Sequence, residues 1–200
     1  MANFVTIFRI FLIFIASAFL FIWSPNAYIW ALVLIIVAFS MDGVDGYLAR
    51  KFNEESKLGA MLDIMSDRIA ENTLWVVFAV LGWIPAAFPI ISLTRGFITD
   101  GIRSVAMEQG MTAFGASSMQ EDEVYKFICS SKFMRIFYAV AKTLAFILMI
   151  VAQMPGLNLA VAFKLYVIAY VAAMFAIILC VLRGLPVIFE SKKLFKNEKI

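Results

Sequence analysis

Residues 28–52, YIWALVLIIVAFSMDGVDGYLARKF, change from apolar to polar near Ser40. From Tyr28 to Ser40 it is apolar, and it then becomes polar and carries two carboxylates before it ends near Phe52. Backbone groups inside hydrocarbon must be satisfied within their own segment, so an apolar run in a membrane forms a helix. The stretch therefore predicts a membrane helix whose last turns bring acidic side chains to one membrane surface.

The composition of the whole chain agrees with a membrane protein. Of the 200 residues, 64% are apolar and 16% are charged, whereas a soluble globular domain usually has about 25% charged residues. The apolar excess comes in long runs, as expected for spans rather than for a soluble core. The length predicts a single domain over 1–200. A net charge of +3 is too small to indicate a nucleic-acid partner.

Six apolar segments can be drawn along the chain, and a longer polar stretch occupies 107–131. None shows the regular alternation over about ten residues that a membrane β-barrel strand needs. We therefore expect an all-α, polytopic integral membrane protein with six transmembrane helices. The expected helices cover about 4–23, 28–52, 58–82, 86–106, 133–153 and 158–183.

The connections between these segments predict the orientation. The loops SPNA, GWIPAA and QMPGLN, after the first, third and fifth segments, carry no charge. Loops rich in Lys and Arg stay in the cytoplasm, so both termini should be cytoplasmic in a multi-pass protein of the cell membrane. The positive residues of the other loops are Arg50, Lys51, Lys57, Lys126 and Lys132, and a basic tail over about 185–200 adds four lysines.

The chain contains no histidine, and its two cysteines, Cys129 and Cys180, match no zinc spacing. The commonest general base and the commonest soft-metal ligand are thereby excluded. Any metal site must use oxygen ligands, which suit Mg²⁺ or Mn²⁺.

Four aspartates at two predicted helix ends provide such ligands. Asp42 and Asp45 share one helix face with Gly46 and Ala49, at spacings i, i+3, i+4 and i+7. Asp63 and Asp67 follow Gly59 at i, i+4 and i+8 on the next helix. A short connection makes the two helices antiparallel neighbours, so the acidic faces can converge. Four facing carboxylates repel one another unless cations lie between them. Two divalent ions fit this ligand count.

Small residues beside the acids allow a second interpretation of the same faces. A face without side-chain bulk lets a flat ligand, such as a nucleotide base or ribose, approach the backbone closely. Arg50 follows and could meet a phosphate. Small residues in membrane helices also serve as helix-packing contacts.

The combined pattern, D-x-x-D-G-x-x-A-R, eight residues, then G-x-x-x-D-x-x-x-D, resembles the signature of the CDP-alcohol phosphotransferase (CDP-alcohol phosphatidyltransferase) family. The sequence matches it at every fixed position, and the six-helix layout is similar as well. The matching residues are Asp42, Asp45, Gly46, Ala49, Arg50, Gly59, Asp63 and Asp67.

The resemblance implies a metal-dependent membrane transferase that moves a phosphatidyl group from a CDP-linked donor to an acceptor hydroxyl and releases CMP. It implies that Asp42, Asp45 and Asp63 bind a pair of Mg²⁺ or Mn²⁺ ions. Asp67 would be the general base and would also touch the second metal. It further implies a homodimer. The residues implied to line the CDP site are Asp45, Gly46, Ala49, Arg50 and Gly59.

A second group of charges predicts the acceptor site. On the fourth segment, Arg95 and Arg103 lie two helical turns apart, and the fifth segment carries Lys132, Arg135 and Lys142. These side chains could form a basic pocket, in which arginines suit bidentate phosphate contacts. The alternative is that they pair with the motif acids, snorkel to the membrane surface or bind lipid head groups. A phosphorylated acceptor would explain such a pocket better than choline or ethanolamine.

The chain start, NFVTIFRIFL, is similar to the N-x-x-T-x-x-R opening of bacterial phosphatidylglycerophosphate synthases, through Asn3, Thr6 and Arg9. The fifth segment, however, reads SKFMRIFYAVAK rather than their usual G-K-x-K-T. The similarity of the chain start makes glycerol 3-phosphate, with CDP-diacylglycerol as donor, the first acceptor to consider. The alternative is the same chemistry with inositol phosphate or another alcohol acceptor. A cation transporter is a different class, but its acids would lie near the bilayer midplane, often with inverted repeats.

Overall fold

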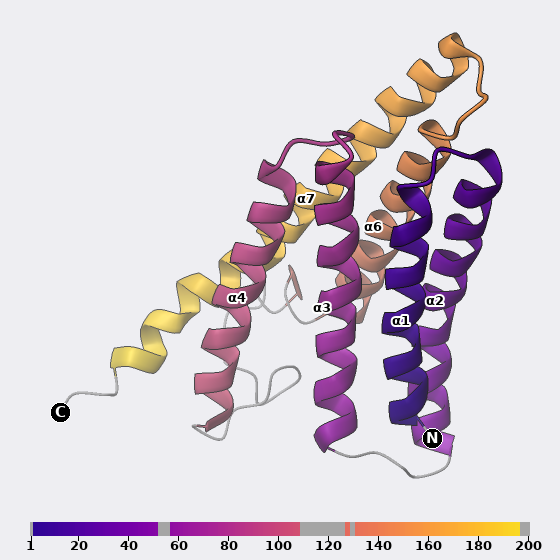
Figure 1. Cartoon of the computed structure of the whole chain (residues 1–200). Coiled ribbons are helices and arrows are strands. Elements are labelled where there is room, and N and C mark those ends of the chain that lie inside the picture. Colours follow the sequence, from indigo (N-terminus) through magenta and orange to yellow (C-terminus); the bar gives the residue numbers. More distant parts are fainter. Residues whose placement is uncertain (1, 52–56, 109–126, 129–130, 197–200) are drawn as a thin grey trace. The chain divides into compact units, whose positions relative to one another are not determined.

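Helix is the only regular secondary structure in the described part of the chain, as the ribbon in Figure 1 shows. The all-α prediction is therefore confirmed. The helices are α1 (Ala2–Leu20), α2 (Pro25–Lys51), α3 (Lys57–Val80), α4 (Ala87–Glu108), α6 (Lys132–Ala152) and α7 (Leu159–Lys196).

This computed structural model describes residues 2–51, 57–108, 127–128 and 131–196. Some positions inside the helices are described by their backbone only. The positions whose side chains are not described are residues 2–3, 42–51, 57–58, 60, 107–108, 132 and 192–196.

The turn after α3 shows why that helix ends where it does. Gly82 has a φ of 75°, a conformation that glycine adopts without the penalty that a Cβ would bring. Its N–H donates to the carbonyl of Ala79, and the N–H of Trp83 donates to the carbonyl of Phe78. The rings of Phe78 and Trp83 lie 5.1 Å apart. This is a Schellman motif with its hydrophobic contact, and it satisfies carbonyls that the helix end leaves open.

Two predicted boundaries were wrong. The turn after the first segment lies earlier than SPNA, because α1 ends at Leu20 and α2 already begins at Pro25, where the fixed φ of proline suits the first helical position. The last helix continues beyond residue 183 to Lys196 and contains Pro186. Val187 and Glu190 are buried, so packing holds this segment helical although proline removes one backbone hydrogen bond.

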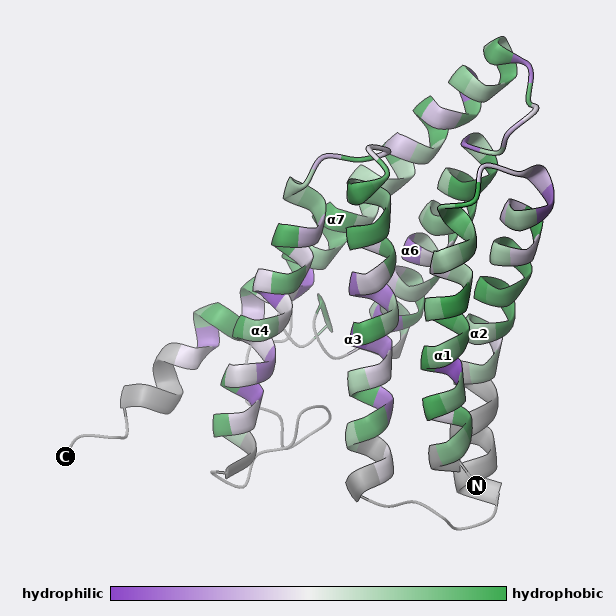
Figure 2. Cartoon of the chain, viewed as in Figure 1, coloured by the Kyte–Doolittle hydropathy of each residue, from purple (hydrophilic) through white to green (hydrophobic). Residues whose placement is uncertain are grey.

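The apolar helices support the membrane prediction in part. Within the described residues, two helical stretches are long and apolar enough to cross a membrane, Phe133–Ala152 and Leu159–Ser191. Phe4–Leu20 and Pro25–Met41 are shorter apolar stretches. α3 carries its charged residues before its apolar last turns and α4 carries charged residues from Arg95 onward, and purple bands mark both helices in Figure 2. The six-span topology stays a prediction.

The chain forms two compact units. Unit 1 comprises residues 1–89 and 146–170, and unit 2 comprises residues 90–145 and 171–200. Unit 1 therefore contains α1, α2 and α3, and unit 2 contains most of α4, the first part of α6 and the larger part of α7.

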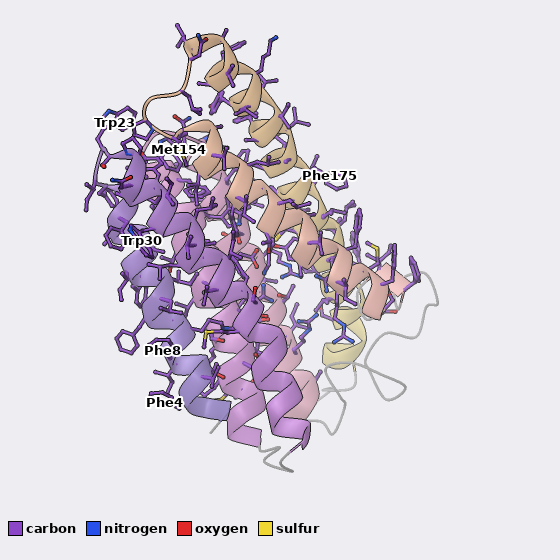
Figure 3. All side chains as sticks on the ribbon, turned by 90° about the vertical axis from the view of Figure 1, so that its right-hand side faces the viewer. Phe4, Phe8, Trp23, Trp30, Met154 and Phe175 are labelled. Atoms are coloured by element: carbon purple, nitrogen blue, oxygen red, sulfur yellow. The ribbon has the colours of Figure 1, made fainter. Side chains whose placement is uncertain are left out.

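In unit 1, α1 packs against both α2 and α3. α1 and α3 run in the same direction and α2 runs opposite to both (Figure 1). The outer face of α1 carries Phe4 and Phe8, which point away from the helices in Figure 3 and stack on each other. Its inner face buries Ile13 and Ala16. This division follows the helical period, because residues three and four apart share one face.

An aromatic cluster fills the end of unit 1 that lies at the C-terminus of α3. The ring of Phe146 lies 4.7 Å from that of Trp75 and 5.7 Å from that of Phe78, both edge-on. The Tyr166 hydroxyl donates a 3.0 Å hydrogen bond to the carbonyl of Trp83. Edge-to-face pairs stabilise by about 0.5–1.5 kcal/mol beyond burial. This end of unit 1 is thus tightly packed, and the polar side chains of α3 lie in its first half.

Candidate functional site

The first half of the acidic motif lies on the last turns of α2. Its backbone is helical through Lys51, so the spacing of Asp42, Asp45, Gly46 and Ala49 does place them on one helix face. Their side chains, and that of Arg50, lie outside the described residues. The end of α2 and the start of α3 lie at the same end of unit 1 (Figure 1). The convergence of the two acidic faces stays a prediction.

The second half of the motif lies on the first turns of α3. Asp63 and Asp67 are half-exposed, with side-chain exposures of 51% and 45%. Gly59, one turn before Asp63, is partly buried. Carboxylates that are anchored on a helix but open to solvent can accept a ligand without a large rearrangement.

A buried arginine from α1 meets these two carboxylates. The Arg9 side chain is only 2% exposed, and its Nη2 donates a 3.2 Å hydrogen bond to Asp67 Oδ1. The same nitrogen lies 3.8 Å from Asp63 Oδ1. Arg9 is the one charged residue in the sequence of α1. An isolated charge inside a protein is costly unless it is paired, and the two aspartates provide that pairing.

Ser66 connects this arginine to the backbone of α3. Its hydroxyl accepts a hydrogen bond from Arg9 Nη2 and donates a 2.9 Å hydrogen bond to the carbonyl of Asp63. Ser66 is completely buried. One guanidinium group therefore lies near three polar side chains on one side of α3, those of Asp63, Ser66 and Asp67.

The donor set around Asp63 and Asp67 suits a hard divalent cation. Both side chains offer only carboxylate oxygens, which Mg²⁺ and Mn²⁺ prefer, and both keep solvent-facing area. Among the residues with described side chains, no group of three or more His, Cys, Asp or Glu could hold a metal ion. A complete metal site would need the acids of α2 as well.

Unit 2 contains the second cluster of charged residues, and its members are cations. Lys142 of α6 and Arg183 of α7 are buried. The Nζ atom of Lys142 lies 5.3 Å from the centre of the Tyr138 ring, and the Arg183 guanidinium carbon lies 5.1 Å from it. Cations are attracted to the face of an aromatic ring, so Tyr138 holds two basic side chains from different helices close together.

Arg95 joins this unit from α4, where it is also buried. Its Nε atom has no hydrogen-bond partner among the described residues. It packs against Gly184 of α7, where an added Cβ would lie 2.8 Å from Arg95 Cγ and 3.1 Å from Nε. The missing side chain of Gly184 is therefore what allows the two helices to approach at this point.

The other predicted acceptor residues have less distinctive surroundings. Arg103 is mostly buried and its Nη1 lies 3.8 Å from Asp100 Oδ1 on its own helix, so pairing with an acid is part of its role. Arg135 lies partly buried on α6. Lys132 is the first residue of α6, and its side chain lies outside the described residues.

Sequence reasoning missed three residues at these clusters. Ser66 gave no signal, because its importance comes from a contact with a residue 57 positions away. Arg183 and Gly184 did give one, since an arginine and a glycine interrupt a long apolar run. Arg9 was recognised only as part of a short opening motif and had no assigned role.

Comparison with known proteins identifies the family. The family model described as CDP-alcohol phosphatidyltransferase matches residues 1–182. A Mycobacterium tuberculosis protein, provisionally named cardiolipin synthase, is 29% identical over 105 residues, which cover 52% of this chain and 50% of that protein.

Two further relatives have names that specify an acceptor. The Bacillus subtilis CDP-diacylglycerol–glycerol-3-phosphate 3-phosphatidyltransferase is 31% identical over 86 residues, 43% of this chain and 45% of that protein. An Arabidopsis thaliana CDP-diacylglycerol–inositol 3-phosphatidyltransferase is 43% identical over 47 residues, 24% of this chain and 21% of that protein. The matched stretches thus span half or less of these relatives. The match over residues 1–182 nevertheless shows that the chain belongs to the CDP-alcohol phosphatidyltransferase family.

Proposed function

We propose that this protein transfers a phosphatidyl group from CDP-diacylglycerol to a phosphorylated polar alcohol and releases CMP. Glycerol 3-phosphate is the favoured acceptor. The observation that carries the proposal is the presence, in a chain of this family, of two charge clusters of opposite sign. Half-exposed carboxylates lie in unit 1, and buried cations lie in unit 2. The first suits metal ions on a pyrophosphate, and the second suits the phosphate of an acceptor.

The reaction is a single displacement at phosphorus. The acceptor hydroxyl oxygen forms a bond to the phosphorus that carries diacylglycerol, and the bond from this phosphorus to the oxygen shared with CMP breaks. CMP leaves with that oxygen, and Asp67 takes the proton of the hydroxyl. A carboxylate is a reasonable base in a chain without histidine.

The proposed metal ligands are Asp42, Asp45, Asp63 and Asp67, which would hold two Mg²⁺ or Mn²⁺ ions. When bound, these ions neutralise the pyrophosphate and stabilise the leaving group. The small residues Gly46, Ala49 and Gly59, together with Arg50, would line the nucleotide site. The α3 pair supports this assignment by its exposure and by its oxygen-only ligands.

The acceptor phosphate would bind to the cations of unit 2. Arg95 supports this because it is a buried guanidinium whose Nε lacks a hydrogen-bond partner among the described residues. A buried donor left without a partner costs free energy that a bound anion would recover. Lys142 and Arg183 add positive charge at the Tyr138 ring. Arg103, Arg135 and Lys132 belong to the same proposed set.

Inositol phosphate or another polar alcohol is the second acceptor candidate, and one relative is named for transfer to inositol itself. We also propose six membrane spans with cytoplasmic termini, supported by the apolar helices and by the loop charges, and a homodimer, supported by the family. No observation favours a cation transporter.

The decisive experiment measures CMP release by the purified protein supplied with CDP-diacylglycerol, Mg²⁺ or Mn²⁺, and four acceptors. These are glycerol 3-phosphate, glycerol, inositol phosphate and inositol, so that each phosphorylated acceptor has a control that lacks only the phosphate. We expect release with glycerol 3-phosphate, none with glycerol, and none after a chelator has removed the metal. Folded protein that releases no CMP with any acceptor would contradict the proposal, and equal rates with glycerol would contradict phosphate recognition.

A further inference from the structure

We propose that Arg9 is a positioning residue for the reaction: it fixes the α3 carboxylates from their buried side and leaves their open side for metal. This inference rests on the proposed function, because it assigns a role in the same site. It starts from an asymmetry in exposure. Arg9 is almost fully enclosed, whereas the two aspartates that it contacts are about half-exposed. The cation and the solvent therefore lie on different sides of the carboxylates.

The hydrogen-bond pattern favours positioning over simple charge balance. Nη2 of Arg9 contacts Asp67, the proposed base, and also Ser66, whose hydroxyl is tied to the backbone of α3 at Asp63. The guanidinium group is planar and rigid, so its contacts fix directions as well as charge. Asp67 Oδ1 is held by this contact.

The same arrangement gives Arg9 a second effect when no metal is bound. Asp63 and Asp67 repel each other, and Arg9 supplies the positive charge that reduces this repulsion. Bound divalent ions would supply more positive charge from the open side. The stabilising effect of Arg9 on the fold should therefore be largest without metal and smaller with it.

A purely structural role would look different. Arg9 also connects α1 to α3, and a helix–helix ion pair would stabilise the fold equally with and without metal. Loss of such a pair would not change the turnover of protein that remains folded. Metal dependence and turnover therefore separate the two roles.

The test uses Arg9→Gln, which removes the charge, and Arg9→Lys, which keeps the charge but lacks the planar guanidinium group. Ser17→Ala is the matched control, because Ser17 is a buried polar residue two turns further along α1 whose Oγ has no partner among the described residues. For Arg9→Gln we expect kcat for CMP release to fall about a hundredfold, the scale for a reacting group displaced by about 1 Å. The donor KM should change little, Arg9→Lys should recover part of kcat, and Ser17→Ala should match wild type.

The second readout is the melting temperature with and without Mn²⁺. We expect Arg9→Gln to melt below wild type in chelator. This difference in melting temperature should narrow at saturating Mn²⁺, because the bound ions supply the positive charge that the variant lacks and so stabilise it more than they stabilise wild type. Wild-type kcat in Arg9→Gln overturns the proposal. A deficit that Mn²⁺ leaves unchanged also overturns it, including the case in which Mn²⁺ stabilises neither protein.

These outcomes separate the two proposals. If wild-type protein releases CMP but Arg9→Gln behaves like it, Arg9 has no positioning role and the proposed function stands. If wild-type protein releases no CMP with any acceptor, the proposed function fails, and the narrowing of the melting deficit alone decides the role of Arg9.

Discussion

The two charged regions of the molecule differ in where their charge faces. In unit 1, the acidic side chains are half-exposed and a buried arginine balances them from behind. In unit 2, the cations Arg95, Lys142 and Arg183 are themselves buried, and two of them pack on a tyrosine ring. An exposed anion with an internal partner can exchange water for a metal ion. A buried cation has already lost its water, so it attracts a small anion more strongly than an exposed one would.

Loss of the proposed base from the acidic cluster of unit 1 should reduce activity most. Asp67→Asn keeps the shape of the side chain and removes its ability to accept a proton. CMP release should fall about a hundred- to ten-thousandfold, the usual contribution of a general base. Binding of the CDP donor, measured separately by its effect on the melting temperature, should largely persist. Wild-type turnover in this variant would exclude Asp67 as the base.

The next largest effect is expected when the cationic cluster of unit 2 loses the charge of Arg95. Arg95→Met keeps an unbranched, though shorter, side chain and removes its charge. We expect KM for glycerol 3-phosphate to rise about ten- to hundredfold, because a hydrogen bond to a charged group contributes about 1.5–3 kcal/mol. The metal concentration for half-maximal rate should stay unchanged. Lys164→Met is the control, since it removes a positive charge from an exposed position. A higher KM in the control, or an unchanged one in Arg95→Met, would contradict the assignment.

Gly184→Ala tests the position of Arg95 separately from its charge, because it disturbs Arg95 without removing any charge. The new Cβ would lie 2.8 Å from Arg95 Cγ, and such overpacking costs about 1–3 kcal/mol. We expect a lower melting temperature and an acceptor KM raised less than in Arg95→Met. Gly101→Ala on α4 is the matched control, since its Cβ would enter open space. If both variants are equally stable and equally active, the contact with Gly184 does not position Arg95.

The smallest expected effect lies outside both clusters. Tyr166→Phe removes the hydrogen bond to the carbonyl of Trp83, which should cost about 1 kcal/mol of stability. Neither kcat nor either KM should change, because Tyr166 belongs to the aromatic end of unit 1. A changed KM for metal or acceptor, with the protein still folded, would show that this end communicates with the charged clusters.

Much of the fold could be predicted because helices are local. Apolar runs and turn residues located the helices to within a few residues, as at Gly82, where the positive φ and the Schellman bonds follow from the local sequence. The extension of α7 was missed because Pro186 is usually a stop signal, and only the burial of Val187 and Glu190 offsets it.

The aspartates of the site could be predicted from the sequence, whereas the contacts of the arginines could not. The aspartates were found because their spacing repeats a helical face. The contact of Arg9 with Ser66 and Asp67 was not, because it joins residues 57 and 58 positions apart, and no local pattern specifies such a pairing. Arg183 stands out in an apolar run, but its contact with Tyr138 could not be predicted, since that contact requires two helices to be in place.

The neighbouring pair Arg183 and Gly184 makes the register of α7 a determinant of specificity. Successive helical residues point about 100° apart, so one turn of α7 directs a guanidinium to the Tyr138 ring of α6 and a bare backbone to Arg95 of α4. Inserting a single residue earlier in the helix would rotate this turn by the same angle. A side chain would then point at α4 in the place where Gly184 leaves room for Arg95, although the composition of the helix would be almost unchanged. The direction in which each residue of this apolar helix points thus affects acceptor specificity, and the hydropathy of the helix does not reveal that direction.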